Sequence, residues 1–409
     1  MRTDLRMTSV EKWLTIVGIG EDGIAGLGDE AKRAISGARH VFGGARHLEL
    51  ARGIIKGQAE QWPVPFAIDP VLALRGQSVC VLASGDPFFY GAGIALTRRI
   101  PAAEIRCLPS PSAFSLAASR LGWPLQNVEC VSLHGRSINL LRPLLHPHRH
   151  ILALTSDGLA PGEIAALITS IGFGGSRIAV LEALGGPAER IRWATADSFD
   201  IENISPLNVL AIEVESNSEA RIISLANGLP DALFDTDGQL TKSEVRAVTL
   251  SGLAPRRGEL LWDVGAGSGS IAIEWMLADP SIRAIAIEAN KERAARVTAN
   301  ANSCGVPGLK LIEGAAPEAL ANLETPDAIF IGGGGSDPGV IPACIKGLKP
   351  GGRLVANAVT LEMEALLLDH HARLGGELIR IAVSRAQPVG SMQGWRAAMP
   401  VTQWRWRKP

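Results

Sequence analysis

The stretch 261-LWDVGAGSGSIAIEW-275 sets three glycines at alternate positions directly behind an apolar run that ends near Asp263. An apolar run closed by a glycine turn is typical of a buried strand in a parallel sheet, and such a turn leads into a helix. Gly265, Gly267 and Gly269 allow the backbone to approach a ligand closely. The stretch therefore predicts a strand–loop–helix unit with a ligand at the carboxyl end of the strand.

The residues around this loop indicate which ligand it holds. A dinucleotide fingerprint needs its third glycine where this sequence has Ser270. We expect Asp263 to point into the site, where a carboxylate opposes a pyrophosphate and suits a sulfonium and an amino group. Glu288 ends the next strand, where it can accept both ribose hydroxyls. We therefore predict S-adenosylmethionine as the cofactor, and a tight turn without a ligand is the alternative.

Outward from this loop the chain alternates between apolar strands and helices. A helix is expected over 290–305, where Gly305 is a stop signal. Such alternation predicts an open, doubly wound α/β sheet of the Rossmann-like class. The expected strands are 259–264, 283–288, 308–312, 327–331, 352–357 and 377–384, with a closing strand near 396–405.

A second glycine loop, 18-GIGEDG-23, matches the dinucleotide pattern by its letters alone. Glu21 and Asp22 place two negative charges where a pyrophosphate needs bare amides at a helix start. The next helix is expected to begin only near Gly28, and the second strand runs into 41-VFGGARHLE-49 without an acidic end. We therefore reject a dinucleotide site at this loop.

The N-terminal half also predicts an α/β fold. Strands are expected at 14–19, 79–83, 151–155 and 207–215, and helices at 27–38 and 91–99, which indicates a mostly parallel sheet. Segment 216–236 has little periodicity and many Ser, Asn, Gly and Pro residues, so we interpret it as a linker. The predicted domains are residues 12–215 and 237–409.

Composition narrows the class of protein. A chain of 409 residues is too long for one ordinary core, and a net charge of −1 argues against nucleic acid or a membrane surface as partner. Arginine supplies most of the 40 basic residues, which suits a polyanionic substrate. Five scattered cysteines without a C-x-x-C predict reduced thiols. Residues 1–13 lack an apolar signal segment, so we expect a soluble, cytoplasmic protein.

Two further patterns suggest chemistry that we do not expect. His146, His148 and His150 could form a metal clip, but Pro147 breaks regular presentation, so we expect a connector and no metal. The tail 404-WRWRKP-409 could stack on nucleic acid. An edge strand with one buried and one exposed face explains the same alternation.

The C-terminal half resembles the decarboxylating precorrin methyltransferases of cobalamin synthesis. The resemblance lies in TKSEVRA (241–247), WDVGAGSGSIAIE (262–274), EGAAPEAL (313–320), DAIFIGGGG (327–335) and LKPGGRLVANAVTLE (348–362). It implies that Asp263, Gly265, Gly267 and Gly269 line the cofactor, that Glu288 holds the ribose, that Gly314 and Ala315 border the adenine, and that Lys242 and Asn357 are substrate-side candidates. Ala315 departs from the family, which usually has Asp there.

The N-terminal half resembles the tetrapyrrole methylases, in particular their C5-methyltransferase branch. The resemblance lies in 83-ASGDPFFYG-91, 109-PSPSAFSLAASRLG-122, 132-SLHGR-136 and 181-LEALGGPAERI-191. It implies two lobes with S-adenosylmethionine between them, and it implies that the glycine loop 18–23 faces the tetrapyrrole substrate. The implied cofactor neighbours are Gly85, Asp86, Phe89, Ser112, Ala113 and Leu133, and the substrate-side candidates are Arg46, His47, His134 and Arg136.

Together the two resemblances imply one fused enzyme of cobalamin synthesis. It would methylate C5 and C15 of a metal-free precorrin with two S-adenosylmethionines, one site per domain, and remove CO2 from the ring C acetate. An electron-rich carbon needs little activation, so we expect proximity and exclusion of water to dominate, and assign no general acid or base. We expect a homo-oligomer. The alternatives are a nucleic-acid or protein methyltransferase on the same folds, and a pair of nucleotide-sensing modules.

Overall fold

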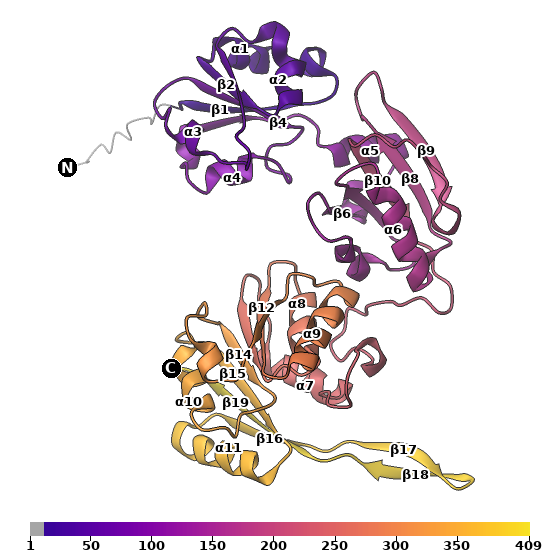
Figure 1. The fold of residues 1–409 in the computed structure, drawn as a ribbon, viewed down its shortest axis with the longest axis vertical. Helices are drawn as coiled ribbons and strands as arrows, with labels where there is room; N and C mark the ends of the chain where they lie inside the picture. Colours follow the sequence, from indigo (N-terminus) through magenta and orange to yellow (C-terminus); the bar gives the residue numbers. More distant parts are fainter. Residues whose placement is uncertain (1–11) are drawn as a thin grey trace, which may run out of the picture. The chain divides into compact units, whose positions relative to one another are not determined.

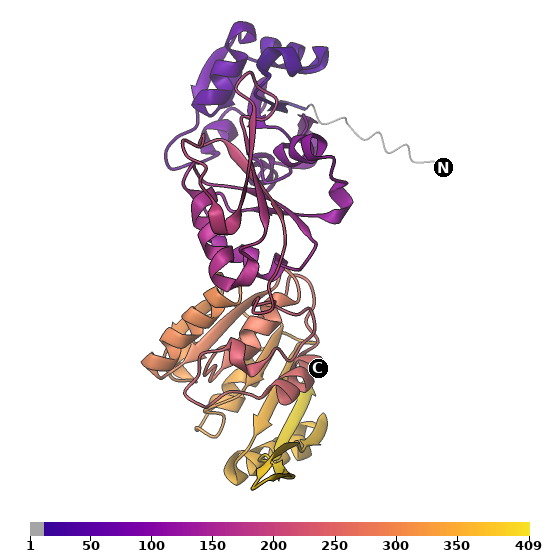
Figure 2. The same ribbon diagram turned by 90° about the vertical axis from the view of Figure 1, so that its right-hand side faces the viewer.

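The computed structural model describes residues 12–409, which divide into two compact units. Residues 12–136 and 146–221 form the first unit, and residues 137–145 and 222–409 form the second. Figures 1 and 2 show the chain from indigo to yellow in two views. Residues 1–11, which include most of the stretch without a signal segment, lie outside the described residues. From residue 12 onward, no helix is long and apolar enough to cross a membrane.

The first unit begins with a five-stranded sheet of order β3-β2-β4-β1-β5, whose neighbouring strands all run parallel. Its strands are β1 (Leu14–Ile19), β2 (His40–Gly43), β3 (Gln58–Gln61), β4 (Val79–Ser84) and β5 (Ile105–Leu108). Its helices are α1 (Asp29–Gly37), α2 (Ala45–Ala51), α3 (Asp69–Leu72) and α4 (Gly93–Thr97). The parallel βα arrangement expected for this part is confirmed.

The second sheet of this unit has the order β6-β7-β10-β8-β9, and only β6 and β7 are parallel. The expectation of a mostly parallel arrangement up to residue 215 is therefore wrong here. The chain between β8 and β9, residues 183–189, contains no helix, so the chain turns back directly instead of crossing over. The elements are β6 (Val128–Ser132), β7 (His150–Leu154), β8 (Arg177–Glu182), β9 (Arg190–Thr195), β10 (Asn208–Glu213), α5 (Ala113–Leu121) and α6 (Ala160–Ile168).

The second unit is built on a seven-stranded sheet of order β13-β12-β11-β14-β15-β19-β16. The first five strands in that order are parallel, which confirms the doubly wound sheet. Its strands are β11 (Leu260–Val264), β12 (Arg283–Glu288), β13 (Lys310–Glu313), β14 (Ala328–Ile331), β15 (Arg353–Ala358), β16 (Glu377–Ile381) and β19 (Val401–Arg407). Its helices are α7 (Ser243–Leu253), α8 (Ser270–Leu277), α9 (Lys291–Ser303), α10 (Val340–Gly347) and α11 (Leu361–Leu374).

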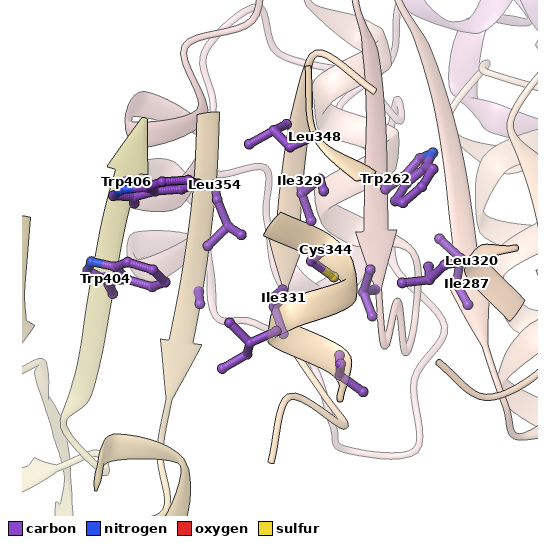
Figure 3. Close-up of a cluster of buried hydrophobic side chains, with 14 of the residues drawn as sticks. Trp262, Ile287, Leu320, Ile329, Ile331, Cys344, Leu348, Leu354, Trp404 and Trp406 are labelled. Atoms are coloured by element: carbon purple, nitrogen blue, oxygen red, sulfur yellow. The ribbon is translucent and has the colours of Figure 1, made fainter. Parts of the chain in front are cut away.

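The end of the chain differs from the expectation in two ways. The strand expected over 377–384 stops at Ile381, and β17 (Ser384–Val389) pairs with β18 (Met392–Ala397) in a hairpin that projects from the sheet in Figure 1. Strand β19 lies between β15 and β16, so it is an inner strand and not an edge strand. Trp404 and Trp406 pack into the buried apolar cluster shown in Figure 3, which explains the alternation of the tail.

The segment predicted as a linker carries part of a core. Ile223, Leu229 and Phe234 are buried and pack in one cluster with Ile273 of α8 and Ala301 of α9. Burial of each such side chain contributes on the order of 2 kcal/mol. Residues 222–236 of this segment are thus built into the second unit.

Candidate active sites

The second unit contains a cavity of about 700 Å³ at the carboxyl ends of its parallel strands. The loop after β11 and the loop after β14 form two of its walls, and residues 238–242 form a rim. Sequence reasoning for an open α/β sheet placed the ligand at this edge. Seven candidate residues line the cavity: Lys242, Gly265, Gly267, Glu288, Gly314, Ala315 and Asn357.

The glycine loop leaves no room for side chains where it meets the loop after β14. Gly265 has φ +70°, and a Cβ atom there would lie 2.3 Å from the carbonyl oxygen of Gly333. Gly269, with φ +78°, caps α8 and is not among the residues that line the cavity. Two backbone segments therefore approach each other closely at the cavity wall, and this is the requirement that glycine meets here.

Glu288 holds the glycine loop and also faces the cavity. One carboxylate oxygen accepts a hydrogen bond from the Gly267 N–H at 2.8 Å, and the other accepts from the Asn290 N–H at 2.9 Å. Each oxygen retains a further lone pair, so the carboxylate can also accept hydroxyl groups from a ligand. Its position at the end of β12 is the one that sequence reasoning expected.

Asp263 lies in a different place from the one expected. The residue is 1% exposed and is not among those that line the cavity, and its carboxylate accepts from the Ala272 N–H of α8 at 3.0 Å. The other carboxylate oxygen has no hydrogen-bond partner within residues 12–409. Burial raises the pKa of Asp263 to about 7, against the effect of the Ala272 hydrogen bond. Asp263 therefore joins the loop to α8 and does not point into the cavity.

A buried ion pair fixes the rim of this cavity. The Arg246 guanidinium is fully buried and donates to Glu274, and it also lies 3.3 Å from Asp231. The same Glu274 carboxylate accepts from the Gly228 N–H at 2.7 Å and the Leu229 N–H at 3.0 Å. The residues that precede the rim are thereby tied to α7 and α8.

Three cationic side chains line the cavity, and each has an acidic partner. Lys242 lies 3.6 Å from Asp231, Arg293 lies 2.7 Å from Asp237, and Arg385 pairs with Glu244. Sequence reasoning found Lys242 but missed Arg293 and Arg385. The helix periodicity of α9 could have placed Arg293 on the cavity side. Arg385 lies at the base of the hairpin β17–β18, and no sequence pattern predicted that hairpin.

The first unit contains a cavity of about 600 Å³ that residues from both of its sheets line. The loop after β4, the start of α5 and the loop after β1 contribute residues, and so do β7 and β10 of the second sheet. Eight candidates line it: Arg46, His47, Gly85, Asp86, Phe89, Ser112, Ala113 and His134. Leu133 is buried, and neither it nor Arg136 is among the lining residues.

A polar cluster occupies the side of this cavity next to the loop after β1. Arg46 donates to Glu21 and, at 2.9 Å, to the Ser84 hydroxyl, which lies 2.8 Å from Nε2 of His47. Burial and the neighbouring Arg46 lower the pKa of His47 to about 4, so the imidazole is neutral at physiological pH. The cluster therefore offers one cation, partly neutralised by Glu21, to a ligand.

Thr155 and Asn208 also line this cavity, and sequence reasoning missed both. The Thr155 hydroxyl donates to Oδ1 of Asn208 at 2.7 Å, and the Asn208 amide donates to the carbonyls of Asp157 and Ser205. Thr155 directly follows β7, and Asn208 is the first residue of β10. A polar residue at the end of an apolar strand was the signal by which both could have been predicted.

The histidines of 146–150 do not gather around a point. His148 is exposed with φ +64° and lies 3.5 Å from Glu215, and His150 stacks on Trp123 at a centroid distance of 4.1 Å. In the part of the chain that the structure describes, no group of three or more His, Cys, Asp or Glu side chains could hold a metal ion.

Comparisons with known proteins assign both units. Residues 13–200 match the family model of the tetrapyrrole (corrin/porphyrin) methylases, and residues 232–408 match that of the precorrin methyltransferase domain. A Sinorhizobium protein named precorrin-6Y C(5,15)-methyltransferase [decarboxylating] is 62% identical over 98% of this chain and 97% of its own length.

Two shorter relatives each match less than half of the chain. A probable cobalt-precorrin-6B C(15)-methyltransferase (decarboxylating) of Pyrobaculum calidifontis is 38% identical over 42% of this chain and 92% of its own length. A cobalt-precorrin-7 C(5)-methyltransferase of Salmonella typhimurium is 30% identical over 46% of this chain and 94% of its own length.

Proposed function

The chain belongs to the family of decarboxylating precorrin-6Y C5,15-methyltransferases, and from that premise we propose that it methylates C5 and C15 of a metal-free precorrin and removes CO2 from the ring C acetate. The observation that carries the proposal is that one chain, similar over nearly its whole length to such an enzyme, contains two separate ligand-sized cavities. Relatives that match less than half of it are named for one methylation each.

The two cavities fit one S-adenosylmethionine each. Volumes of about 700 and 600 Å³ lie in the range of roughly 300–1,000 Å³ that small-molecule sites occupy. When bound, this cofactor supplies an electrophilic methyl group on a sulfonium. In the second unit the backbone of Gly265, Gly267 and Gly314 allows close approach, and Glu288 accepts hydroxyl groups. Ala315, in place of the usual Asp, leaves the adenine edge without a carboxylate.

In the first unit the cofactor site consists of residues around the loop after β4 and the start of α5. Asp86 accepts from the Phe88 N–H at 2.9 Å, and Ser112 caps α5 through the Ser115 N–H at 3.1 Å. These local hydrogen bonds fix the two loops against which a ligand would pack. The proposed holders are Gly85, Asp86, Phe89, Ser112 and Ala113.

The substrate's carboxylates need cations at both sites. Arg46 in the first unit, and Lys242, Arg293 and Arg385 in the second, line the cavities and can exchange an intramolecular partner for a substrate carboxylate. His134 lines the first cavity as a further hydrogen-bonding side chain. The reacting carbons are electron-rich, so the chain's contribution is to bind, to orient and to exclude water. The alternation of charges along both cavities suits a small polyanion better than nucleic acid.

The same proposal includes the domain boundary, the cellular location and the oligomeric state. We place the boundary between the two catalytic domains in segment 216–236, and the reaction in the cytoplasm, since the described residues contain no disulfide. We also propose a homo-oligomer. The hairpin β17–β18 exposes Val389, Met392 and Trp395, and a two-stranded hairpin gains stability when it packs against another surface.

The test uses the full chain, labelled S-adenosylmethionine and a metal-free tetrapyrrole, with RNA as the control substrate. Asp86→Ala and Glu288→Ala each remove one carboxylate from one cavity. We expect the wild type to transfer two methyl groups and release CO2, Asp86→Ala to lose one methyl group and retain CO2 release, and Glu288→Ala to lose the other methyl group together with CO2 release. Product masses separate these outcomes, and label in RNA alone would overturn the proposal.

A further inference from the structure

A chain of hydrogen bonds beneath the cavity of the second unit joins β19, α7 and β15. Nε of Arg405 donates to Oε1 of Gln403 at 2.7 Å. Nε2 of Gln403 donates to Oδ1 of Asn357 at 2.9 Å and to Oγ1 of Thr249 at 3.0 Å. Nδ2 of Asn357 donates to the same Thr249 oxygen at 3.1 Å. Gln403 and Thr249 are both fully buried, so water does not compete for these bonds.

The protons of this network have one consistent arrangement. Arginine only donates, so the oxygen of the Gln403 amide must face Arg405 and its nitrogen must face Asn357. At the other end, the Thr249 hydroxyl donates to the Val245 carbonyl at 2.8 Å, so its oxygen is an acceptor. The Asn357 amide therefore turns its oxygen to Gln403 and its nitrogen to Thr249. A flipped amide would set two donors against each other, so the network fixes an orientation that is otherwise ambiguous.

Asn357 is the member of this network that lines the cavity. It lies one residue before the end of β15, at the edge of the sheet where the glycine loop also lies. One of its two N–H groups is bound to Thr249, and the second remains for a ligand. The cationic side chains of the cavity already have acidic partners, whereas this N–H group is a neutral donor held in a fixed direction.

We propose that Arg405, Gln403 and Thr249 are positioning residues that hold the Asn357 amide so that its second N–H orients the substrate carboxylate that leaves as CO2. This inference rests on the proposed function. In that step the bond between the acetate CH2 and its carboxylate breaks, the electron pair enters the conjugated macrocycle, and a proton then adds to the CH2 carbon. A charged donor binds a carboxylate about twice as strongly as a neutral amide does. An arginine in this position would therefore stabilise the carboxylate before the bond breaks, and it would slow the release of CO2.

The first experiment replaces Gln403 in the full chain with an acid of nearly the same shape. Gln403→Glu still accepts from Arg405 but has no N–H for Asn357, so the Asn357 amide is expected to turn its nitrogen toward the new carboxylate. We expect the rate constant of CO2 release to fall by at least about tenfold, which corresponds to the loss of one oriented hydrogen bond. The affinity for S-adenosylhomocysteine, measured by calorimetry, is expected to stay within about twofold, since cofactor-site groups are unchanged.

Control variants separate positioning from folding. Arg405→Lys keeps a donor opposite Gln403 and is expected to retain CO2 release, whereas Arg405→Met releases the Gln403 amide and is expected to lower it. Asn357→Ala should lose as much as Gln403→Glu, and the double variant should lose no more than either, because both remove one interaction. Thermal unfolding of the second unit and its binding of S-adenosylhomocysteine report whether each variant is folded. C5 methylation, which we assign to the first unit, serves as the internal standard for enzyme concentration.

Two results overturn the inference: wild-type CO2 release in Gln403→Glu, or losses that add in the double variant. A wild-type chain that neither methylates a tetrapyrrole nor releases CO2 contradicts the proposed function instead. The two failures are therefore distinguishable, because the first appears only in variants and the second appears in the unmodified protein.

Discussion

The stretch 18-GIGEDG-23 includes the last two residues of β1, and 265-GAGSG-269 directly follows β11. Each of these strands is the first of its sheet in chain order and pairs with parallel neighbours. Gly269 caps α8, which begins at the next residue, so the second loop opens directly into a helix. In the first unit a four-residue turn, Gly23–Gly26, and a further glycine stand between the loop and α1, which begins at Asp29. The two loops therefore share closely spaced glycines, but only the second loop leads directly into a helix.

The neighbours of the two loops also differ. Glu288 at the end of β12 accepts from the backbone of the second loop, whereas β2 in the first unit ends in Gly43. Glu21 of the first loop pairs with Arg46 at the cavity, and the Asp22 carboxylate folds back toward Gly26. A glycine pattern therefore indicates close backbone packing, and the residues after it decide whether the loop holds a cofactor or faces a substrate.

The largest effect is expected from the ion pair that holds the rim beside the second loop. Glu274→Ala leaves the fully buried Arg246 without its main partner, and such a loss costs about 3–5 kcal/mol. The unfolding free energy of the second unit should fall by that amount, and its cofactor binding should disappear. Calorimetry with S-adenosylhomocysteine should then find one site in place of two. Glu324→Ala, which breaks a half-exposed pair with Arg283, is the matched control and should change little.

Asp263 makes the stability of the second unit depend on pH. Its pKa of about 7 lies above the value of about 3.9 for a free aspartate, so the carboxyl contributes stability that is present below about pH 4 and is lost as the pH rises through 7. The full span is up to about 4 kcal/mol. Asp263→Asn resembles the protonated form and should be the more stable protein above pH 8.

Urea unfolding of the two proteins from pH 5 to pH 9 measures this difference. The unfolding free energy of the wild type should fall as the pH rises, until it lies below that of Asp263→Asn by the full span. The unfolding free energy of Asp263→Asn should not show this fall. Asp337→Asn, an exposed carboxylate on the same cavity, serves as the control. Parallel curves for wild type and Asp263→Asn would contradict the buried, unionised carboxyl. At each pH the substitution Asp263→Asn should leave the unfolding transition of the first unit unchanged, because Asp263 belongs to the second unit.

A methyl group added to the second loop should disturb the close contact between this loop and the loop after β14. In Gly265→Ala the new Cβ meets the Gly333 carbonyl at 2.3 Å and the backbone keeps a positive φ, which together cost on the order of 3 kcal/mol. C15 methylation and CO2 release should be lost. Gly267→Ala shares the positive φ but has no neighbour closer than 3.7 Å, so it should lose less. Equal losses in the two variants would mean that backbone strain, and not the close approach, decides.

Much of this fold could be predicted from hydrophobic periodicity and from the glycine turns that end the strands. Strands β11 to β15 show this, because a buried parallel strand is an apolar run that a glycine turn ends. The hairpin β17–β18 was missed because the alternation of β16 continues across Ile381 into exposed residues that no core constrains. The tail was misplaced because insertion of β19 between β15 and β16 depends on a non-local pairing. The orientation of Asp263 depends on an N–H of α8, and sequence spacing alone does not fix such a contact.

The smallest effect is expected in the first loop, from Glu21→Gln. The pair with Arg46 is partly exposed, so its removal should change the unfolding free energy by less than about 1 kcal/mol. Arg46 keeps its hydrogen bond to Ser84 and gains freedom to bind a substrate carboxylate. We therefore expect the KM of C5 methylation to fall by roughly twofold to fivefold, since a competing carboxylate is gone. The affinity for S-adenosylhomocysteine should not change, because the proposed cofactor holders of this unit lie in other loops. Steady-state kinetics with the tetrapyrrole and calorimetry with the cofactor product measure the two quantities separately. A lost cofactor affinity with an unchanged KM would show that this loop, like the second one, serves the cofactor, and the contrast between the two loops would then be wrong.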